Sequence, residues 1–138
     1  MTIAFHPEPG TILICDFVGL KTPEMTKRRP VVVISPRFRD RPELCTIVPL
    51  STTAPQKVCA YHHLLDFDPP MPAPYSSPRM WVKGDMIYAV GFHRLSLPFV
   101  GKDGKGDRVY DVRHLKGGDL AAVRECVLHA LGLPAVHC

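Results

Sequence analysis

Residues 9–35 read PGTILICDFVGLKTPEMTKRRPVVVIS, two apolar segments on either side of a polar loop. The first segment, residues 11–18, is β-branched and apolar and follows the turn-forming pair Pro9-Gly10. The second segment begins with Pro30 and continues as a run of valines, which have a high β propensity. A proline is tolerated at the first position of a strand because no ladder hydrogen bond is lost inside it. The sequence therefore predicts an initial hairpin whose two strands are joined by a loop over residues 19–29.

Further short strands are predicted along the next eighty residues. LCTIVPL at residues 44–50 is a predicted third strand, and VCAYHHLLDF at residues 58–67 is a candidate fourth. Residues 80–90 form either two short strands or one bent strand, because a Lys-Gly-Asp segment separates two apolar runs. Residues 109–113 are a further candidate for a short strand. Between these strands, residues 68–78 contain five prolines, which excludes a central strand or a helix and predicts an extended surface loop.

The C-terminal part of the chain has the spacing of a helix. After Gly117-Gly118, apolar residues recur at intervals of three and four, at Leu120, Val123, Val127, Leu128 and Leu131. Asp119 is a suitable N-cap, and Gly132 supplies a stop signal. A helix is therefore expected at about residues 119–131.

Short strands, glycine and proline turns and one terminal helix together predict a mostly β fold. The expected architecture is a small, partly open β-barrel with the C-terminal helix packed on it. The 138 residues fit one domain, residues 1–138, because a chain of about 150 residues buries roughly 68–70% of its surface in a single core.

Composition places few limits on the partner but indicates a compartment. The chain has 17 Lys and Arg against 13 Asp and Glu, and a net charge of +4 permits a polyanionic partner without requiring one. The five cysteines are odd in number and lack zinc-ligand spacing, which favours reduced thiols in a cytoplasmic protein. No signal peptide or membrane-spanning apolar run is apparent, so no membrane association is expected.

Five segments follow one another in a characteristic order. They are PGTILICDF, a loop with Glu24 and Lys27, RRPVVVIS, IVPLSTT at residues 47–53 and WVKGDMIYAVGFHRL at residues 81–95. In this order they resemble the PemK/MazF family of toxins from bacterial toxin–antitoxin pairs. That family has a Gly-led strand, an acidic residue and a Lys in a loop, Arg-Pro before valines, Val-Pro-Leu-Thr, and a later acidic residue with a closing Arg-Leu. The resemblance covers nearly the whole chain.

The resemblance implies a specific fold and activity. Family members have an SH3-like barrel, act as homodimers and cut single-stranded RNA without a metal or other cofactor, and a small antitoxin protein blocks the RNA groove. The family's catalytic Arg before the proline matches Arg29. Its catalytic Thr aligns with Ser51, a departure that keeps a hydroxyl group. Other residues implied in substrate binding are Glu24, Lys27, Arg28, Thr52 and Asp85.

The chemistry of these residues suits RNA cleavage by the attack of a 2′-OH on the adjacent phosphorus, which leaves a cyclic phosphate and a 5′-OH. The planar guanidinium of Arg29 can hold two phosphate oxygens, as a lysine cannot. The hydroxyl of Ser51 or Thr52 can donate to the same developing charge. Glu24 is a candidate to orient Arg29. Candidate proton carriers are His62, His63 and His93, and candidate base-stacking platforms are Phe17, Tyr61, Trp81 and Phe92.

Two other functions stay open at this point. The first is a non-cleaving binding module of the same barrel, such as a gyrase-targeting toxin or an inactive RNA-binding relative. The second is a scaffold protein that binds a peptide. A groove lined by Arg29 and other cations favours nucleic acid, whereas an apolar, uncharged groove favours a peptide.

Overall fold

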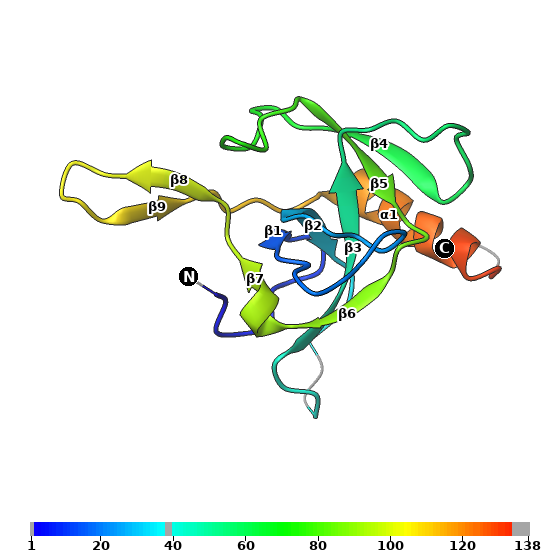
Figure 1. Cartoon of the computed structure of the whole chain (residues 1–138), viewed down its shortest axis with the longest axis horizontal. Helices are drawn as coiled ribbons and strands as arrows, with labels where there is room; N and C mark the ends of the chain where they lie inside the picture. The colour runs from blue at the N-terminus through cyan, green and yellow to red at the C-terminus, as the bar shows by residue number, and fades with distance from the viewer. Residues whose placement is uncertain (1, 38–39, 134–138) are drawn as a thin grey trace.

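The computed structural model describes residues 2–37 and 40–133. Nine short strands, one 3-10 turn and one α-helix follow each other along the chain (Figure 1). Their bounds are β1 Ile12–Cys15, β2 Arg29–Val33, β3 Leu44–Ser51, β4 His62–Asp66, β5 Arg79–Lys83, β6 Tyr88–Gly91, η1 Phe92–Arg94, β7 Leu95–Ser96, β8 Phe99–Lys102, β9 Arg108–Tyr110 and α1 Gly117–Ala130. The prediction of a mostly β fold with one C-terminal helix is confirmed.

The strands form open antiparallel sheets. The hydrogen-bonded order is β4-β5-β3-β2-β1-β7, with β6 paired to β3 beside this path. The predicted initial hairpin is present, since β1 pairs with β2 from Ile12 opposite Val32 to Cys15 opposite Arg29. No pairing joins β4 to β7 in the part of the chain that the structure describes, so no closed barrel is seen.

Strand β3 connects the two parts of the sheet. Its first half pairs with β6, from Leu44 opposite Gly91 onward, and its last residues pair with β5, where Ser51 lies opposite Trp81. The segment at residues 80–90 is therefore two strands rather than one bent strand, because β5 and β6 pair with different parts of β3. The end of β3 is thus fixed between β2 and β5.

Both faces of the initial hairpin are buried, which explains its nearly continuous apolar sequence. Successive strand side chains point to opposite faces. Ile12 and Val32 belong to one apolar cluster, which includes Val123 of α1, while Leu13 and Val31 belong to a second cluster around Phe17. The valine run that ends β2 therefore contributes to both clusters.

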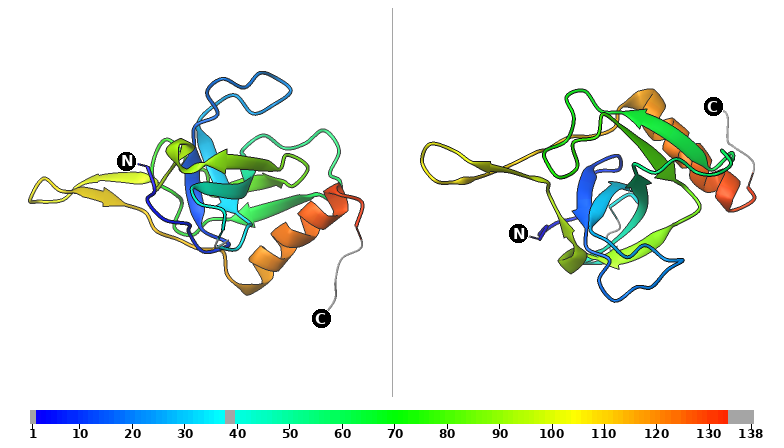
Figure 2. Two further views of the ribbon diagram at one scale, coloured as in Figure 1. Left: turned by 90° about the horizontal axis from the view of Figure 1, so that it is seen from below. Right: turned by 45° about the horizontal axis from the view of Figure 1, so that its top comes forward.

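The helix α1 packs against β4 and β5 (Figure 2). It begins two residues before the predicted start, with Lys116 as the N-cap. The prediction of Asp119 as the N-cap is wrong, because Asp119 lies within the first turn, where a carboxylate is favourable to the helix dipole. Its carboxylate instead lies 3.8 Å from Nε2 of His63 on β4.

Strands β8 and β9 form a hairpin that projects from the body of the molecule (Figures 1 and 2), and we call residues 99–110 the arm. In this region the sequence predicted only a short strand at residues 109–113, so the hairpin was missed. The proline-rich residues 68–78 contain no helix or strand. No helix in residues 2–37 and 40–133 has the length and apolar character needed to cross a membrane.

Three of the cysteines pack in the apolar interior. Cys15, Cys45 and Cys126 are buried, and burial raises the pKa of the Cys15 thiol to about 12 and the pKa of Cys45 and Cys126 to about 11. Buried thiols with raised pKa values are poor nucleophiles, so these three have a packing role. Cys138 lies outside the described residues.

Candidate functional site

Arg29 is the first residue of β2 and is held by strand pairing. It lies opposite Cys15 of β1, and Pro30 follows it at a buried position. The Arg29 side chain is half-buried, and its Nε is buried with no hydrogen-bond partner among the described residues. A buried donor without an acceptor costs free energy. The guanidinium is thus prepared to receive an acceptor from outside the chain.

The register of β2 against β3 places Ser51 beside Arg29. Val31 lies opposite Pro49 and Val33 opposite Ile47. Continued by two residues, the same antiparallel register brings Arg29 opposite Ser51, the last residue of β3. Opposite side chains of an antiparallel pair lie on the same face, with Cβ atoms about 4.5–5.5 Å apart.

A cavity of about 250 Å³ lies at these two strand ends, and we call it the Arg29 cavity. Five of the seven site residues implied by the sequence line it, namely Lys27, Arg28, Arg29, Ser51 and Thr52. Pro74 and Tyr75 of the proline-rich loop form another part of its wall. The cavity therefore combines three cationic side chains with hydroxyl groups.

The Ser51 hydroxyl is available as a donor in the Arg29 cavity. Its Oγ accepts a hydrogen bond from the backbone N–H of Thr53 at 3.1 Å. A hydroxyl has one donor and two acceptor positions, so this contact leaves the Ser51 proton free. Ser51 can thus donate to an anion while its oxygen stays fixed by Thr53.

A fourth cation, Lys83 at the end of β5, adds to the positive field. Burial lowers the pKa of Lys83, and the Arg29 charge lowers it further, against an opposite effect of Asp85. Sequence reasoning missed Lys83. Its position in the sequence could have indicated it, because Lys83 lies two residues after Trp81 and both side chains are therefore on the same face of the strand.

The two acidic residues implied by the resemblance do not line the Arg29 cavity. Glu24 accepts a hydrogen bond from the backbone N–H of Lys21 at 3.2 Å, within the β1–β2 loop. No ion pair joins Glu24 to Arg29 within the described part of the chain, so the structure gives no support to Glu24 as the residue that orients Arg29. Asp85 instead acts electrostatically on Lys83, Tyr61 and His62.

The candidate proton carriers also lie outside the cavity lining. Nδ1 of His62 accepts a hydrogen bond from the backbone N–H of Cys59 at 3.0 Å. Burial lowers the pKa of His62, and the Lys83 charge lowers it further. His63 faces Asp119 of α1, and His93 lies in η1. None of the three histidines is among the residues that line the Arg29 cavity.

One candidate stacking residue is excluded by burial. Phe17 is fully buried against the ring of Tyr88, so the prediction of Phe17 as a base-stacking platform is wrong. The position of Phe17 after the first predicted strand does not indicate that its ring is buried in the second apolar cluster. Tyr75, which sequence reasoning missed, is the aromatic side chain in the wall of the Arg29 cavity.

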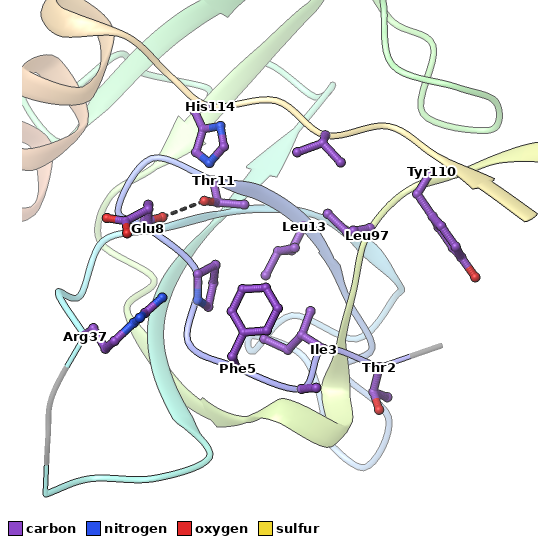
Figure 3. Close-up of a pocket in the computed structure, with 13 residues that line it drawn as sticks. Thr2, Ile3, Phe5, Glu8, Thr11, Leu13, Arg37, Leu97, Tyr110 and His114 are labelled. Atoms are coloured by element: carbon purple, nitrogen blue, oxygen red, sulfur yellow. Dashed lines mark hydrogen bonds between the residues drawn. The ribbon is translucent and has the colours of Figure 1, made fainter.

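A larger, apolar cavity of about 530 Å³ lies elsewhere, between the N-terminal segment and the connection from the arm to α1 (Figure 3). Phe5, Leu13 and Leu97 contribute to its lining, with Arg37 and His114 at its border. None of the site residues implied by the sequence lines it. The cationic Arg29 cavity is therefore the candidate functional site.

The Arg29 cavity has the chemistry of a phosphate site. Three cations and two or more hydroxyls can hold a phosphate group and stabilise negative charge on its oxygens. Within residues 2–37 and 40–133, no three His, Cys, Asp or Glu side chains come together as metal ligands.

Comparison with solved structures finds the same fold in several proteins. The chain aligns with the crystal structure of MazF (Form-I) from Deinococcus radiodurans at a TM-score of 0.61 and 18% identity, over 94% of this chain and 100% of that chain. It aligns with an endoribonuclease in complex with its cognate antitoxin from a mycobacterial species at a TM-score of 0.58 and 19% identity, over 94% of this chain and 98% of that chain. The alignment with the Mycobacterium tuberculosis toxin MazF-mt6 has a TM-score of 0.58 and 17% identity, over 92% of this chain and 99% of that chain.

Comparison with sequences defines the family. A search of curated proteins finds no match. The model of a protein family described as PemK-like, MazF-like toxin of type II toxin–antitoxin system matches residues 8–129. That range includes both strand ends of the Arg29 cavity and nearly all of α1. The chain therefore belongs to the family of PemK-like, MazF-like toxins of type II toxin–antitoxin systems.

Proposed function

We propose that this protein is the toxin of a type II toxin–antitoxin pair and an endoribonuclease that cleaves single-stranded RNA without a metal ion or other cofactor. The observation that carries the proposal is the Arg29 cavity, where Arg29, Ser51 and Thr52 come together with two further cations. The family assignment and the endoribonuclease named among the similar structures support the same activity.

The proposed reaction is an internal phosphodiester transfer. The 2′-OH of one nucleotide attacks the adjacent phosphorus, and the bond from phosphorus to the 5′ oxygen of the next nucleotide breaks. The 2′-OH loses a proton and the leaving 5′ oxygen gains one, which yields a 2′,3′-cyclic phosphate and a 5′-OH. Arg29 holds two phosphate oxygens, and Ser51 and Thr52 donate to the negative charge that develops on them.

The proposal extends to the partners and the architecture. We infer a homodimer of SH3-like barrels in the cytoplasm, with a cognate antitoxin protein that covers the RNA groove. The similar structures include an endoribonuclease in complex with its cognate antitoxin and a MazE-MazF complex from Deinococcus radiodurans, which supports an antitoxin partner. The basic Arg29 cavity favours RNA over an uncharged peptide as the ligand.

The test is cleavage of a long single-stranded RNA in EDTA. We expect the parent protein to produce discrete fragments and Arg29→Ala to cleave at least about a hundredfold more slowly, as expected for the loss of a main transition-state donor. Arg29→Lys should not restore the rate, because a lysine lacks the planar fork. Arg124→Ala, at an exposed position on α1, is the matched control and should keep the parental rate.

A different result would favour the non-cleaving alternatives. If the parent leaves varied RNAs intact and instead blocks supercoiling by DNA gyrase, the protein is a gyrase-targeting module of the same fold. If it binds RNA without cutting it, it is an inactive RNA-binding relative. Either outcome contradicts the proposed nuclease.

A further inference from the structure

A second cavity of about 250 Å³ adjoins the Arg29 cavity, and we call it the arm cavity. Arg28, Pro74 and Tyr75 line both cavities, so the two lie next to each other. The arm cavity extends from these shared residues to the base of the arm, where Phe99, Arg108 and Tyr110 line it. A ligand that leaves the Arg29 cavity past Tyr75 would enter the arm cavity.

The far wall of the arm cavity is a cluster of aromatic rings and a guanidinium. Arg108 lies over the ring of Phe99, with Cζ 4.4 Å from the ring centroid. The rings of Phe99 and Tyr110 meet edge to face at a centroid distance of 5.9 Å, and Phe99 is 41% exposed. Exposed aromatic rings and guanidinium planes are the surfaces on which unpaired nucleic-acid bases stack.

Two polar features of the arm cavity also suit a nucleotide. Arg28 is an exposed cation at the junction with the Arg29 cavity, where a phosphate next to the one held by Arg29 would lie. The hydroxyl of Tyr110 is buried and has no hydrogen-bond partner among the described residues. Such a group costs free energy until an acceptor or donor reaches it.

The arm is a well-formed hairpin, not a loose loop. At its tip, the Asp103 carboxylate accepts hydrogen bonds from the backbone N–H groups of Lys105 at 2.8 Å and Asp107 at 3.0 Å. At its base, the N–H of Asp111 donates to the carbonyl of Pro98 at 2.8 Å. The wall of the arm cavity is therefore held in place by both ends of the hairpin.

The sizes of the two cavities favour a chain-like ligand. Each is smaller than the roughly 300–1,000 Å³ typical of pockets for compact ligands. Two small, adjacent cavities, one rich in cations and one with an aromatic wall, match successive units of a single strand. We propose that the arm cavity binds an unpaired nucleotide that flanks the scissile phosphate, with its base on Phe99 and Tyr110 and its phosphate near Arg28 and Arg108.

This inference rests on the proposed function, since it takes the ligand of the Arg29 cavity to be RNA. It assigns a role to the arm that goes beyond phosphate binding at Arg29. The RNA held by the protein should extend from the cleavage site toward the arm, and nucleotides on that side should raise the affinity.

The experiment compares short and extended RNAs. After the cleaved site is mapped on a long RNA, a short RNA around that site and versions extended by a few nucleotides on either side are prepared. The kcat/KM of cleavage is measured for each RNA, and the affinity is measured for versions with a 2′-deoxy group at the scissile position. We expect extension on one side to raise both quantities about tenfold in the parent protein.

Arg108→Ala and Phe99→Ala should reduce that gain to near unity. Lys105→Ala, which removes the same charge at the tip of the arm, and Val100→Ala, which shortens an exposed neighbour of Phe99, are the matched controls and should keep the gain. The inference is overturned if extension has no effect in the parent, or if Lys105→Ala removes the gain as fully as Arg108→Ala. It is also overturned if Arg108→Ala weakens binding of an oligo-glutamate peptide and leaves RNA binding unchanged.

The two proposals fail in different ways. If the parent protein cleaves no RNA, the proposed function fails, while the affinities of the parent and of Arg108→Ala for single-stranded RNAs of increasing length still test the arm cavity. If the parent cleaves RNA and the gain from extension is absent, only the arm cavity is contradicted.

Discussion

Arg29 combines a fixed backbone with an unsatisfied side chain. Its strand pairing to Cys15 and the proline after it restrict the main chain, while the buried Nε has no partner among the described residues. Lys27 and Arg28 line the same cavity, and the charge of Lys83 also acts on Arg29. Like charges at one site repel one another, and an anion between them relieves that repulsion. A phosphate is thus favoured by both the charge and the missing hydrogen bond.

The contribution of Ser51 can be separated from that of Arg29. Ser51→Ala removes the free hydroxyl donor, and we expect the rate of RNA cleavage to fall about a hundredfold, the usual effect of losing one such donor. Ser51→Thr keeps a hydroxyl at the same position and should retain most of the parental rate. Single-turnover kinetics check both. An unchanged rate in Ser51→Ala would assign the role to Thr52 instead.

His62 predicts a pH dependence of stability. Its pKa in the folded protein lies below the ordinary value of 6.5, first because of burial and then because of Lys83. The folded state therefore binds fewer protons than the unfolded state between the two pKa values. The free energy of unfolding should fall as the pH decreases through about 6.5 and stop falling below the folded pKa.

The control for this pH effect is His62→Asn. An Asn side chain can still accept the hydrogen bond from the Cys59 N–H and does not titrate. Urea unfolding of both proteins from pH 8 to pH 5 measures the difference. The slope with pH should be shallower in the variant, and equal slopes would show that His62 does not contribute.

At the scale of elements, the contact of β5 with α1 depends on Gly84. A Cβ at Gly84 would lie 2.6 Å from the carbonyl oxygen of Tyr61 and 2.7 Å from Cβ of Cys126 on α1. Gly84→Ala should therefore lower the free energy of unfolding by about 1–3 kcal/mol, the usual cost of overpacking. Gly104→Ala, in open space on the arm, is the control and should change it little. Urea unfolding distinguishes the two.

The elements that the sequence predicts well are those with strong local patterns. The valine run of β2 and the helical spacing of α1 are examples, because their apolar periodicity reflects burial on one or both faces. Strand β7 has only two residues and exists because Ser96 pairs with Ile14 of β1. Strand β8 contains Gly101 and an irregular register, so its sequence resembles a turn.

The site residues likewise differ in whether a local sequence pattern or a tertiary contact places them. Arg29 and Ser51 are adjacent because two predicted strands pair in a regular register, and the family resemblance marks the same two residues. Tyr75 reaches the site from a proline-rich loop whose path depends on tertiary contacts, which no local pattern encodes. Glu24 and Asp85 match motif positions but do not line the cavity, so their part in substrate binding stays a prediction from the resemblance.

At the scale of the whole molecule, open sheets and one helix hold two adjacent cavities that share Arg28, Pro74 and Tyr75. The core residues of the sheets are the neighbours of the site residues, so the same strands provide stability and position the chemistry. The arm adds a basic and aromatic wall next to the site. On this account, the molecule is a rigid frame for a single RNA strand.

The most direct test of this account is the chemical identity of the RNA ends. The parent protein in EDTA is incubated with an RNA and with the same RNA carrying a 2′-deoxy nucleotide at the mapped site, and the fragments are analysed by mass spectrometry. We predict a 2′,3′-cyclic phosphate and a 5′-OH from the first RNA, no cut at the modified site, and at least about a hundredfold slower release of fragments with Arg29→Ala. Fragments with 5′-phosphate ends, a cut at the 2′-deoxy site, or an undiminished cut by Arg29→Ala would contradict it.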